Sequence, residues 1–206
     1  MAGAAPLAPA EPPPTPRAAA RRRTALGPSS LAGQQAAVVA QIAAVAPLLA
    51  LYFWHAPPRL AALWPALGEC APAALPVLLP RLLAASALPL LAAAVFVGNA
   101  RFLGPGMNPL EEPMAASVLC RNLQNTLEQY VLHVAAAAGL AAWGCCAHAA
   151  ALVPCFAAGR LLFLAGYLVH PAWRGAGFSA TAVPTLGALA YCAWRLARDG
   201  PAAGLA

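Results

Sequence analysis

Apolar residues dominate five long stretches of this chain, and polar residues gather before and between them. A helix needs about 20 predominantly apolar residues to cross the hydrocarbon core of a bilayer. The fourth stretch begins only a few residues after the third, so these two helices should form an antiparallel hairpin. The pattern therefore predicts an all-α membrane protein whose five helices cover residues 36–54, 73–100, 113–142, 147–169 and 180–196.

The third stretch carries polar and charged residues at membrane depth. Arg121, Asn125 and Glu128 follow the spacing i, i+4 and i+7, which places them on one narrow stripe of a helix. A charge at the bilayer centre costs at least about 2.5 to 3.5 kcal/mol, so such residues normally face a partner or a polar cavity. Arg121 and Glu128 lie about two turns apart, which is too far for an easy ion pair. We expect each to meet another helix, another subunit or a ligand, with a structural interhelical network as the alternative.

The fourth stretch supplies a second group of polar residues. Arg160, Tyr167 and Arg174 are spaced by seven residues, and Phe163 falls near the same face. They share one face if the helix continues to Arg174, but Pro171 makes this continuation uncertain because proline removes a backbone donor. The alternatives are an interfacial aromatic role for Tyr167 and a topology-setting loop charge at Arg174.

The composition also indicates a membrane protein. The chain is 62% hydrophobic and 9% charged, with a mean hydropathy of +0.69, whereas about 25% of residues are charged in a soluble domain. The net charge of +6 comes from twelve arginines and no lysine. No basic run is interleaved with aromatic residues, so we expect no nucleic-acid partner. The expected partner is the lipid bilayer itself.

Arginine placement gives an approximate orientation. Residues 1–34 are rich in Pro, Ala and Arg and are expected to form a disordered tail, with a cleaved signal peptide or a transit peptide as alternatives. The tail arginines favour a cytosolic N-terminus. With five spans, Arg101 and Arg174 share the cytosolic side, and Arg195 and Arg198 lie opposite. A re-entrant or absent segment would reverse the C-terminal orientation. Taken alone, Arg101 is interpreted as a snorkelling or loop arginine.

The six cysteines and four histidines show no pattern of a metal site or a disulfide framework. Most cysteines lie in or beside apolar runs, where cysteine behaves as a small hydrophobic residue, and no CxxC occurs. Palmitoylation of the adjacent Cys145 and Cys146 is the alternative interpretation. No HxxxH spacing is present, so we expect no bound metal. His133 is interpreted as a structural histidine inside the bundle.

At these positions the chain resembles the MAPEG family, the membrane-associated proteins in eicosanoid and glutathione metabolism. The resemblance covers roughly residues 73–196 and implies a four-helix bundle that assembles as a homotrimer, with glutathione bound between subunits near the cytosolic side. It rests on four features that occur in order with family-like spacing, namely Arg101, the motif Arg121-x-x-x-Asn125-x-x-Glu128, Arg160 with Gly166-Tyr167, and Arg174.

The resemblance implies roles for these residues. Arg174 would stabilise the glutathione thiolate, because a nearby guanidinium favours the anion and lowers the pKa of the thiol. Arg101 would assist at the site of the neighbouring subunit. The remaining glutathione contacts would come from Arg121, Asn125, Glu128, Gln129, Phe163 and Tyr167.

The chain departs from the glutathione-using members of that family in ways that imply a different branch. Gln129 stands where an aromatic or other contact residue is common, and Phe163 replaces a frequent tyrosine. The run Asn-Thr-Leu-Glu-Gln at 125–129 resembles bacterial MAPEG proteins and the mattrin branch of animal transmembrane proteins. The mattrin branch also has an additional helix, as at 35–56 here, before the MAPEG-like domain at 73–198. For that branch the resemblance does not imply enzyme activity. It implies a non-enzymatic or weakly enzymatic protein of secretory-pathway membranes (endoplasmic reticulum, Golgi or lysosome-related) that acts in trafficking, barrier function or receptor regulation through membrane-protein partners.

The polar residues favour another function, a glutathione-dependent transferase or peroxidase that acts on lipophilic substrates. A transporter or channel is a third interpretation. It has little support, since the chain shows neither inverted repeats nor a ring of charges.

Overall fold

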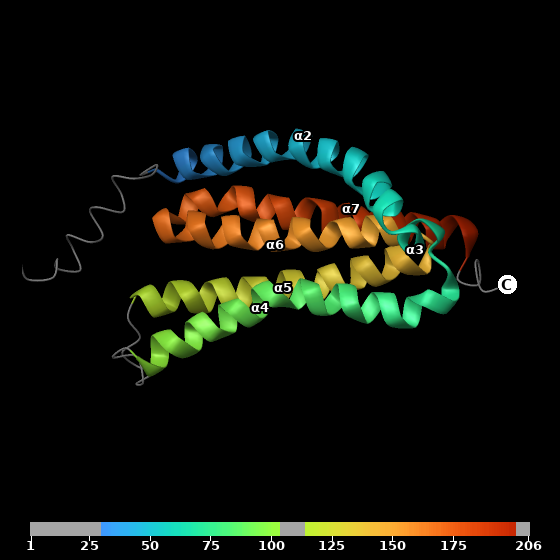
Figure 1. Ribbon diagram of the computed structural model, residues 1–206. Coiled ribbons are helices and arrows are strands. Elements are labelled where there is room, and N and C mark those ends of the chain that lie inside the picture. The colour runs from blue at the N-terminus through green and yellow to red at the C-terminus, as the bar shows by residue number, and fades with distance from the viewer. Residues whose placement is uncertain (1–29, 104–113, 201–206) are drawn as a thin grey trace, which may run out of the picture.

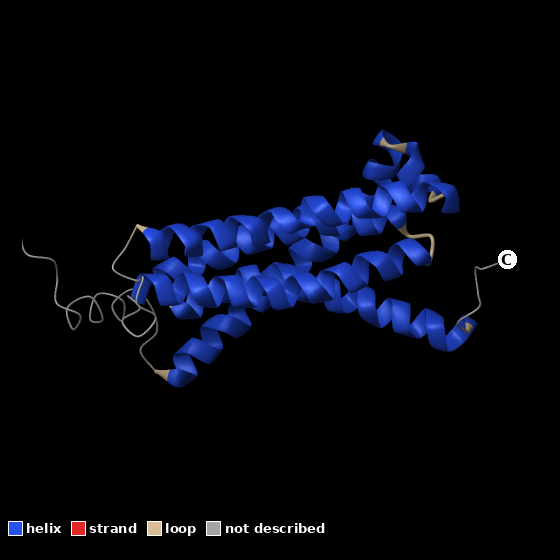
Figure 2. Cartoon of the chain, turned by 90° about the horizontal axis from the view of Figure 1, so that it is seen from below, coloured by secondary structure: helices blue, strands red, loops and turns tan. Residues whose placement is uncertain are grey.

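Apolar runs in lipid must pair their own backbone groups and therefore become helical. In the part of this chain that the structure describes, five long helices run up and down in one bundle (Figure 1). The computed structural model describes residues 30–103 and 114–200. No β-strand occurs among these residues (Figure 2). The elements are α2 (Leu31–Leu63), α3 (Pro65–Glu69), η1 (Pro72–Ala74), α4 (Leu75–Phe102), α5 (Met114–Ala142), α6 (Cys146–Val169), η4 (Pro171–Arg174) and α7 (Gly175–Asp199).

The five predicted helices and the short α5–α6 hairpin are confirmed. The largest difference concerns α2, which begins before residue 36 and ends after residue 54. Ser30 explains the early start, because its Oγ accepts a 3.1 Å hydrogen bond from the backbone N–H of Gly33 and so caps the helix. Three prolines, at 47, 57 and 58, lie inside α2, and the helix is visibly curved (Figure 1). The first 29 residues of the expected tail lie outside the described residues.

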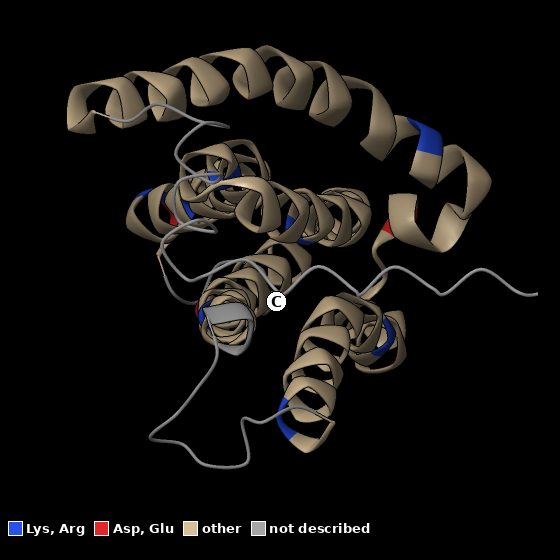
Figure 3. Cartoon of the chain, turned by 90° about the vertical axis from the view of Figure 1, so that its left-hand side faces the viewer, with Lys and Arg blue, Asp and Glu red and all other residues tan. Residues whose placement is uncertain are grey.

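Four of the long helices, α2, α4, α6 and α7, are long and apolar enough to cross a membrane. Helix α5 carries the polar stripe, has 29 residues, and packs against α4, α6 and α7. Charged residues occupy few positions of the helices (Figure 3). The chain is therefore an integral, multi-pass membrane protein with an all-α bundle fold, as the sequence predicts.

Small residues bring α6, η4 and α7 into close contact. A side chain at Gly177 of α7 would collide with the backbone of Phe163, and one at Gly166 would collide with the backbone of Trp173. Close backbone approach through small residues is a common way to pack membrane helices. Glycine at 166 therefore allows η4 to fold back against the end of α6, which fixes where Arg174 lies.

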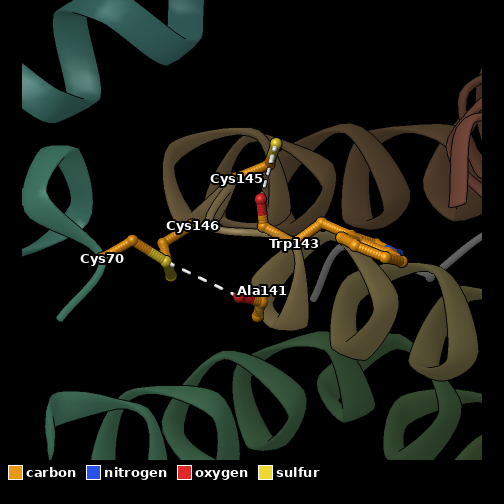
Figure 4. The surroundings of a disulfide bond; sticks show 5 residues. All are labelled: Cys70, Ala141, Trp143, Cys145 and Cys146. Carbon is orange, nitrogen blue, oxygen red and sulfur yellow. Dashed lines mark hydrogen bonds between the residues drawn. A yellow bond between two sulfur atoms is a disulfide. The ribbon is translucent and has the colours of Figure 1, made fainter. Parts of the chain in front are cut away.

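A disulfide joins Cys70, which follows α3, to Cys146 at the start of α6 (Figure 4). The two Cα atoms are 5.4 Å apart across a sequence separation of 76 residues. The interpretation of Cys70 and Cys146 as unpaired small hydrophobic residues is wrong, and so is palmitoylation of Cys146, whose sulfur is bonded. Sequence spacing missed the pair because the two cysteines meet only when α4 and α5 return the chain to the same end of the bundle.

Candidate functional site

A polar cavity of about 440 Å³ lies at the end of the bundle opposite the disulfide. Elements far apart in the sequence build its wall. Six of the eight predicted site residues line it together with four others, and the ten are Val38, Arg121, Gln124, Asn125, Glu128, Phe163, Tyr167, Arg174, Gly175 and Phe178. The predicted stripe on α5 and the predicted group after α6 therefore face one shared space.

Helix α5 presents its stripe to this cavity. Arg121 and Glu128 are exposed, and Asn125 between them is half-buried. The Nε2 of Gln124 donates a 2.9 Å hydrogen bond to Oε1 of Glu128, which orients the carboxylate. Neither Arg121 nor Glu128 forms an ion pair within the described part of the chain, so both charges are available to a ligand or to another subunit.

Arg160 lies behind the cavity wall, not on it. Its side chain is fully enclosed, with 3% of the residue exposed. Nη1 donates a 2.8 Å hydrogen bond to Oδ1 of Asn125, and Nη2 donates a 2.7 Å bond to Oγ1 of Thr181. The guanidinium also lies over the ring of Phe163, with 4.6 Å between Cζ and the ring centroid. Arg160 thus holds Asn125 in place and adds positive charge beneath the cavity.

A turn, rather than a continuous helix, brings Arg174 beside Tyr167. Helix α6 ends at Val169, and Pro171 opens the 3₁₀ turn η4, so the seven-residue spacing does not follow one helix to its end. The guanidinium of Arg174 nevertheless lies over the ring of Tyr167, at 5.2 Å from its centroid. Arg174 also precedes the first residue of α7, where the helix dipole favours negative charge. This corner of the cavity is suited to an anion.

Arg101 and Gln129, the other two predicted site residues, do not line the cavity of this chain. Arg101 lies exposed near the end of α4, and its Nη2 donates a 3.4 Å hydrogen bond to Sγ of Cys120. Gln129 is buried inside the bundle, one residue beyond Glu128 and therefore on another face of α5. His133 shares that interior face, and its Nε2 lies 2.9 Å from Oγ of Ser86, as expected of a structural histidine.

Sequence reasoning missed the contribution of α2. Val38 lines the cavity, and Gln41 hydrogen-bonds to the backbone on both sides of Arg174. Gln41 is the one amide side chain within the apolar stretch 36–54. A lone amide in such a stretch needs a partner at membrane depth, and this was the signal available in the sequence.

The fold and the cavity define a helical membrane protein with an electropositive, ligand-sized site at one end of its bundle. Comparison with known families matches residues 77–194 to the MAPEG family, which is more than half of the chain. The chain belongs to the MAPEG family. No curated protein and no solved structure matches it. The match includes most of α4, all of α5 and α6, and most of α7, and it leaves α2 outside.

Proposed function

We propose that this protein binds glutathione in the polar cavity and activates its thiol for reaction with a lipophilic substrate. The observation that carries the proposal is the meeting of the α5 stripe with Tyr167 and Arg174 around one space of about 440 Å³. Cavities of about 300 to 1,000 Å³ are usual for small ligands. The residues come from separate elements, so their convergence is a property of the fold.

The charges of the cavity wall complement those of glutathione. Two guanidinium groups, from Arg121 and Arg174, face a ligand with two carboxylates, and the Glu128 carboxylate is available to the ligand's ammonium group. Arginine binds carboxylates through paired hydrogen bonds. The amide of Asn125, fixed by Arg160, suits the peptide groups of the ligand.

Arg174 is the residue proposed to activate the thiol. Its guanidinium would favour the thiolate over the thiol, because a positive charge nearby stabilises the anion and lowers the thiol pKa. The thiolate is the reactive nucleophile. The start of α7 beside Arg174 acts in the same direction. In this role Arg101 would act on the cavity of a neighbouring subunit in a homotrimer.

The test is the ultraviolet thiolate band of glutathione added to the purified full chain in detergent at neutral pH. Wild type should show the band, and Arg174→Ala should lose it. The matched control is Arg198→Ala, because Arg198 is an exposed arginine that pairs with Asp199 at the opposite end of α7. Absence of the band in well-folded wild-type protein would overturn the proposal.

A second candidate function is favoured by α2. This helix of 33 residues lies outside the family match and packs along α6 and α7, and Phe163 supplies no hydroxyl to the cavity. Both features support a mattrin-like, non-enzymatic trimer of secretory-pathway membranes that acts on trafficking, barrier function or receptors through membrane-protein partners. Here the exposed charges of Arg121 and Glu128 would join subunits.

The two functions differ in what those charges do. If the charges join subunits, Glu128→Gln should dissociate the trimer at any glutathione concentration, as measured by light scattering of the detergent-solubilised protein. If they bind glutathione, the oligomer should persist and only ligand binding should weaken.

A further inference from the structure

An apolar hollow of about 370 Å³ lies at the disulfide end of the bundle, opposite the polar cavity. Cys145, which precedes the disulfide-bonded Cys146, lines this hollow. The wall takes apolar side chains from α2, α5, α6 and α7, namely Phe53, Leu140, Leu152 and Ala188. No residue of the polar cavity lines it. The hollow is therefore separate from the proposed glutathione site.

Helix α7 supplies one continuous face of the hollow. The lining residues on this helix follow the spacing i, i+3, i+4 and i+7, and they are Pro184, Gly187, Ala188 and Tyr191. They cover about 10.5 Å of the helix axis at 1.5 Å per residue. Only Tyr191 has a long side chain. The face is thus a flat, apolar strip that ends at a phenol hydroxyl.

Gly187 keeps the middle of this strip flat. Glycine weakens a helix relative to alanine. At Gly177 of the same helix, packing requires it, because a side chain there would collide with the backbone of Phe163. At Gly187 the backbone is exposed, and an added Cβ would meet nothing among the described residues within 4 Å. Packing within the chain therefore leaves this surface open to an occupant.

The hydroxyl of Tyr191 forms the polar end of the strip. It accepts a 3.1 Å hydrogen bond from Nη1 of Arg195 and keeps its own proton to donate. Sγ of Cys145, a weak partner, lies 3.8 Å from it. Arg195 forms a 2.6 Å ion pair with Asp199 and lies over the ring of Trp143, with Cζ 4.8 Å from the centroid. The charge near this end is already matched, so the group on offer is a neutral hydroxyl.

We propose that this hollow binds a sterol. A sterol has a rigid, flat, apolar ring system with one hydroxyl at its end, which matches the strip from Pro184 to Tyr191. The rings lie on Gly187 and Ala188, and the sterol oxygen accepts a hydrogen bond from Tyr191. A phospholipid headgroup matches less well, because no arginine lines the hollow and Arg195 is paired. The site goes beyond the proposed function and does not depend on it.

The direction of the strip suits a sterol in a bilayer. Arg195 and Asp199 mark the polar end of α7, about one and two turns beyond Tyr191. A bound sterol thus keeps its hydroxyl toward the headgroups and its rings toward the bilayer centre. The residues Leu189-x-Tyr191-x-x-x-Arg195 also fit a short pattern proposed for cholesterol contact. That pattern is unspecific by itself, and the hollow beside Tyr191 gives it meaning here.

The test is labelling of the purified full chain in detergent, without glutathione, by cholesterol that carries a photoreactive diazirine. Gly187→Leu fills the strip, and Tyr191→Phe removes the hydroxyl. Gly98→Leu is the matched control, because Gly98 of α4 is an exposed glycine with equally open surroundings outside the hollow. Mass spectrometry locates the label, and displacement by unlabelled cholesterol gives the affinity.

Wild type and Gly98→Leu should be labelled saturably on residues 184–191. Gly187→Leu should weaken binding by at least roughly tenfold, since the leucine side chain takes the place of the rings. Tyr191→Phe should weaken it roughly two- to tenfold, the effect of one neutral hydrogen bond. Unlabelled cholesterol should displace the probe, and excess phosphatidylcholine should not.

Three results would overturn the proposal. Equal affinity of Gly187→Leu and Gly98→Leu would show that the strip is not the site. Displacement by phosphatidylcholine would mean that the hollow holds ordinary acyl chains. No saturable labelling of wild type, with a changed oligomeric state of Gly187→Leu, would assign the hollow to a second copy of the chain.

A folding defect in Gly187→Leu would leave the wild-type label to decide. Label on residues 184–191 or on Phe53 supports the site, and label confined to other segments overturns it. The thiolate band is measured separately, so the glutathione proposal and the sterol proposal can fail independently.

Discussion

Arg160 donates a 2.8 Å hydrogen bond to Oδ1 of Asn125, and this bond joins a buried charge to the wall of the polar cavity. Among the described residues no carboxylate pairs with Arg160, whose other hydrogen-bond partner is Thr181. A buried cation without a counterion is costly. Arg160 lies beneath a cavity that suits an anion. The same residue therefore takes part in the packing of the bundle and in the proposed ligand site.

Arg160→Leu should weaken glutathione binding by at least roughly tenfold, because the cation is lost and the Asn125 amide loses the group that orients it. It should also lower the free energy of unfolding by about 1 to 3 kcal/mol, since Thr181 and Asn125 are left with unmet hydrogen bonds. Calorimetric titration measures the first effect and denaturant titration the second. Arg59→Leu, at an exposed arginine outside the cavity, is the control. Equal affinity of the Arg160 and Arg59 variants would contradict the role given to Arg160.

Glu128 should recognise the ammonium group of glutathione. Glu128→Gln should therefore weaken binding of glutathione roughly tenfold, because a charged hydrogen bond is replaced by a neutral one. The same variant should bind N-acetylglutathione as wild type does, since that ligand has no ammonium group. Affinities measured for both ligands by titration give the comparison. A similar loss for both ligands would mean that Glu128 acts on the shape of the cavity and not on that charge.

Gln41→Leu should raise the pKa of the bound thiol. The variant removes the two hydrogen bonds that tie α2 to the backbone around Arg174, from Gln41 to Ala172 and from Ala176 to Gln41, so the guanidinium is no longer held beside the thiolate. On the proposed function, the thiol pKa in wild type should lie below its free value, so that the thiolate is present at neutral pH. In the variant the thiolate band should disappear at neutral pH and return as the pH is raised. A pH titration of the band measures this shift.

The control for this titration is Ile42→Leu, a change at the adjacent, more exposed position of α2. Its titration curve should coincide with that of wild type. If Gln41→Leu also coincides with wild type, η4 and the start of α7 hold Arg174 without help from α2.

Part of the candidate site could be predicted from the sequence because it depends on the periodicity of a helix. Arg121, Asn125 and Glu128 fall on one stripe because every residue of a helix turns by about the same angle, and the same rule puts Gln129 on another face. Phe163 and Tyr167 follow on α6 for the same reason. The long apolar stretches likewise fixed the helices and their order, because length and hydropathy are local properties.

Other parts depend on contacts between distant segments. The seven-residue spacing grouped Arg160 with Tyr167 and Arg174, yet Arg160 is buried toward α7 and Arg174 lies on a turn. Gln41 meets Ala172 across a separation of 131 residues, which no periodicity reveals. For Gln41 the only local signal was that an amide among apolar residues is costly unless it finds a hydrogen-bond partner.

The Cys70–Cys146 disulfide predicts the orientation of the bundle. Disulfides persist in oxidising compartments, so the end that holds this pair should face the lumen or the cell exterior, and the end with Arg101 and Arg174 should face the cytosol. The positive-inside rule gives the same orientation, because the tail arginines precede the start of α2 at that end. On the proposed function, glutathione would then come from the cytosol. The end of α7 lies on the disulfide side.

A glycosylation acceptor inserted after α7 should be modified in cells, and one inserted before α2 should not. Cys146→Ser should lower the free energy of unfolding by about 2 to 4 kcal/mol, because the cross-link is lost. A thermal or denaturant transition measures this change. Reduction of the disulfide in wild type should cause the same loss. Cys192→Ser, at a free and partly buried cysteine, is the matched control and should leave both stability and orientation unchanged. Glycosylation at the α2 end would reverse the orientation and place the proposed glutathione site in the oxidising compartment.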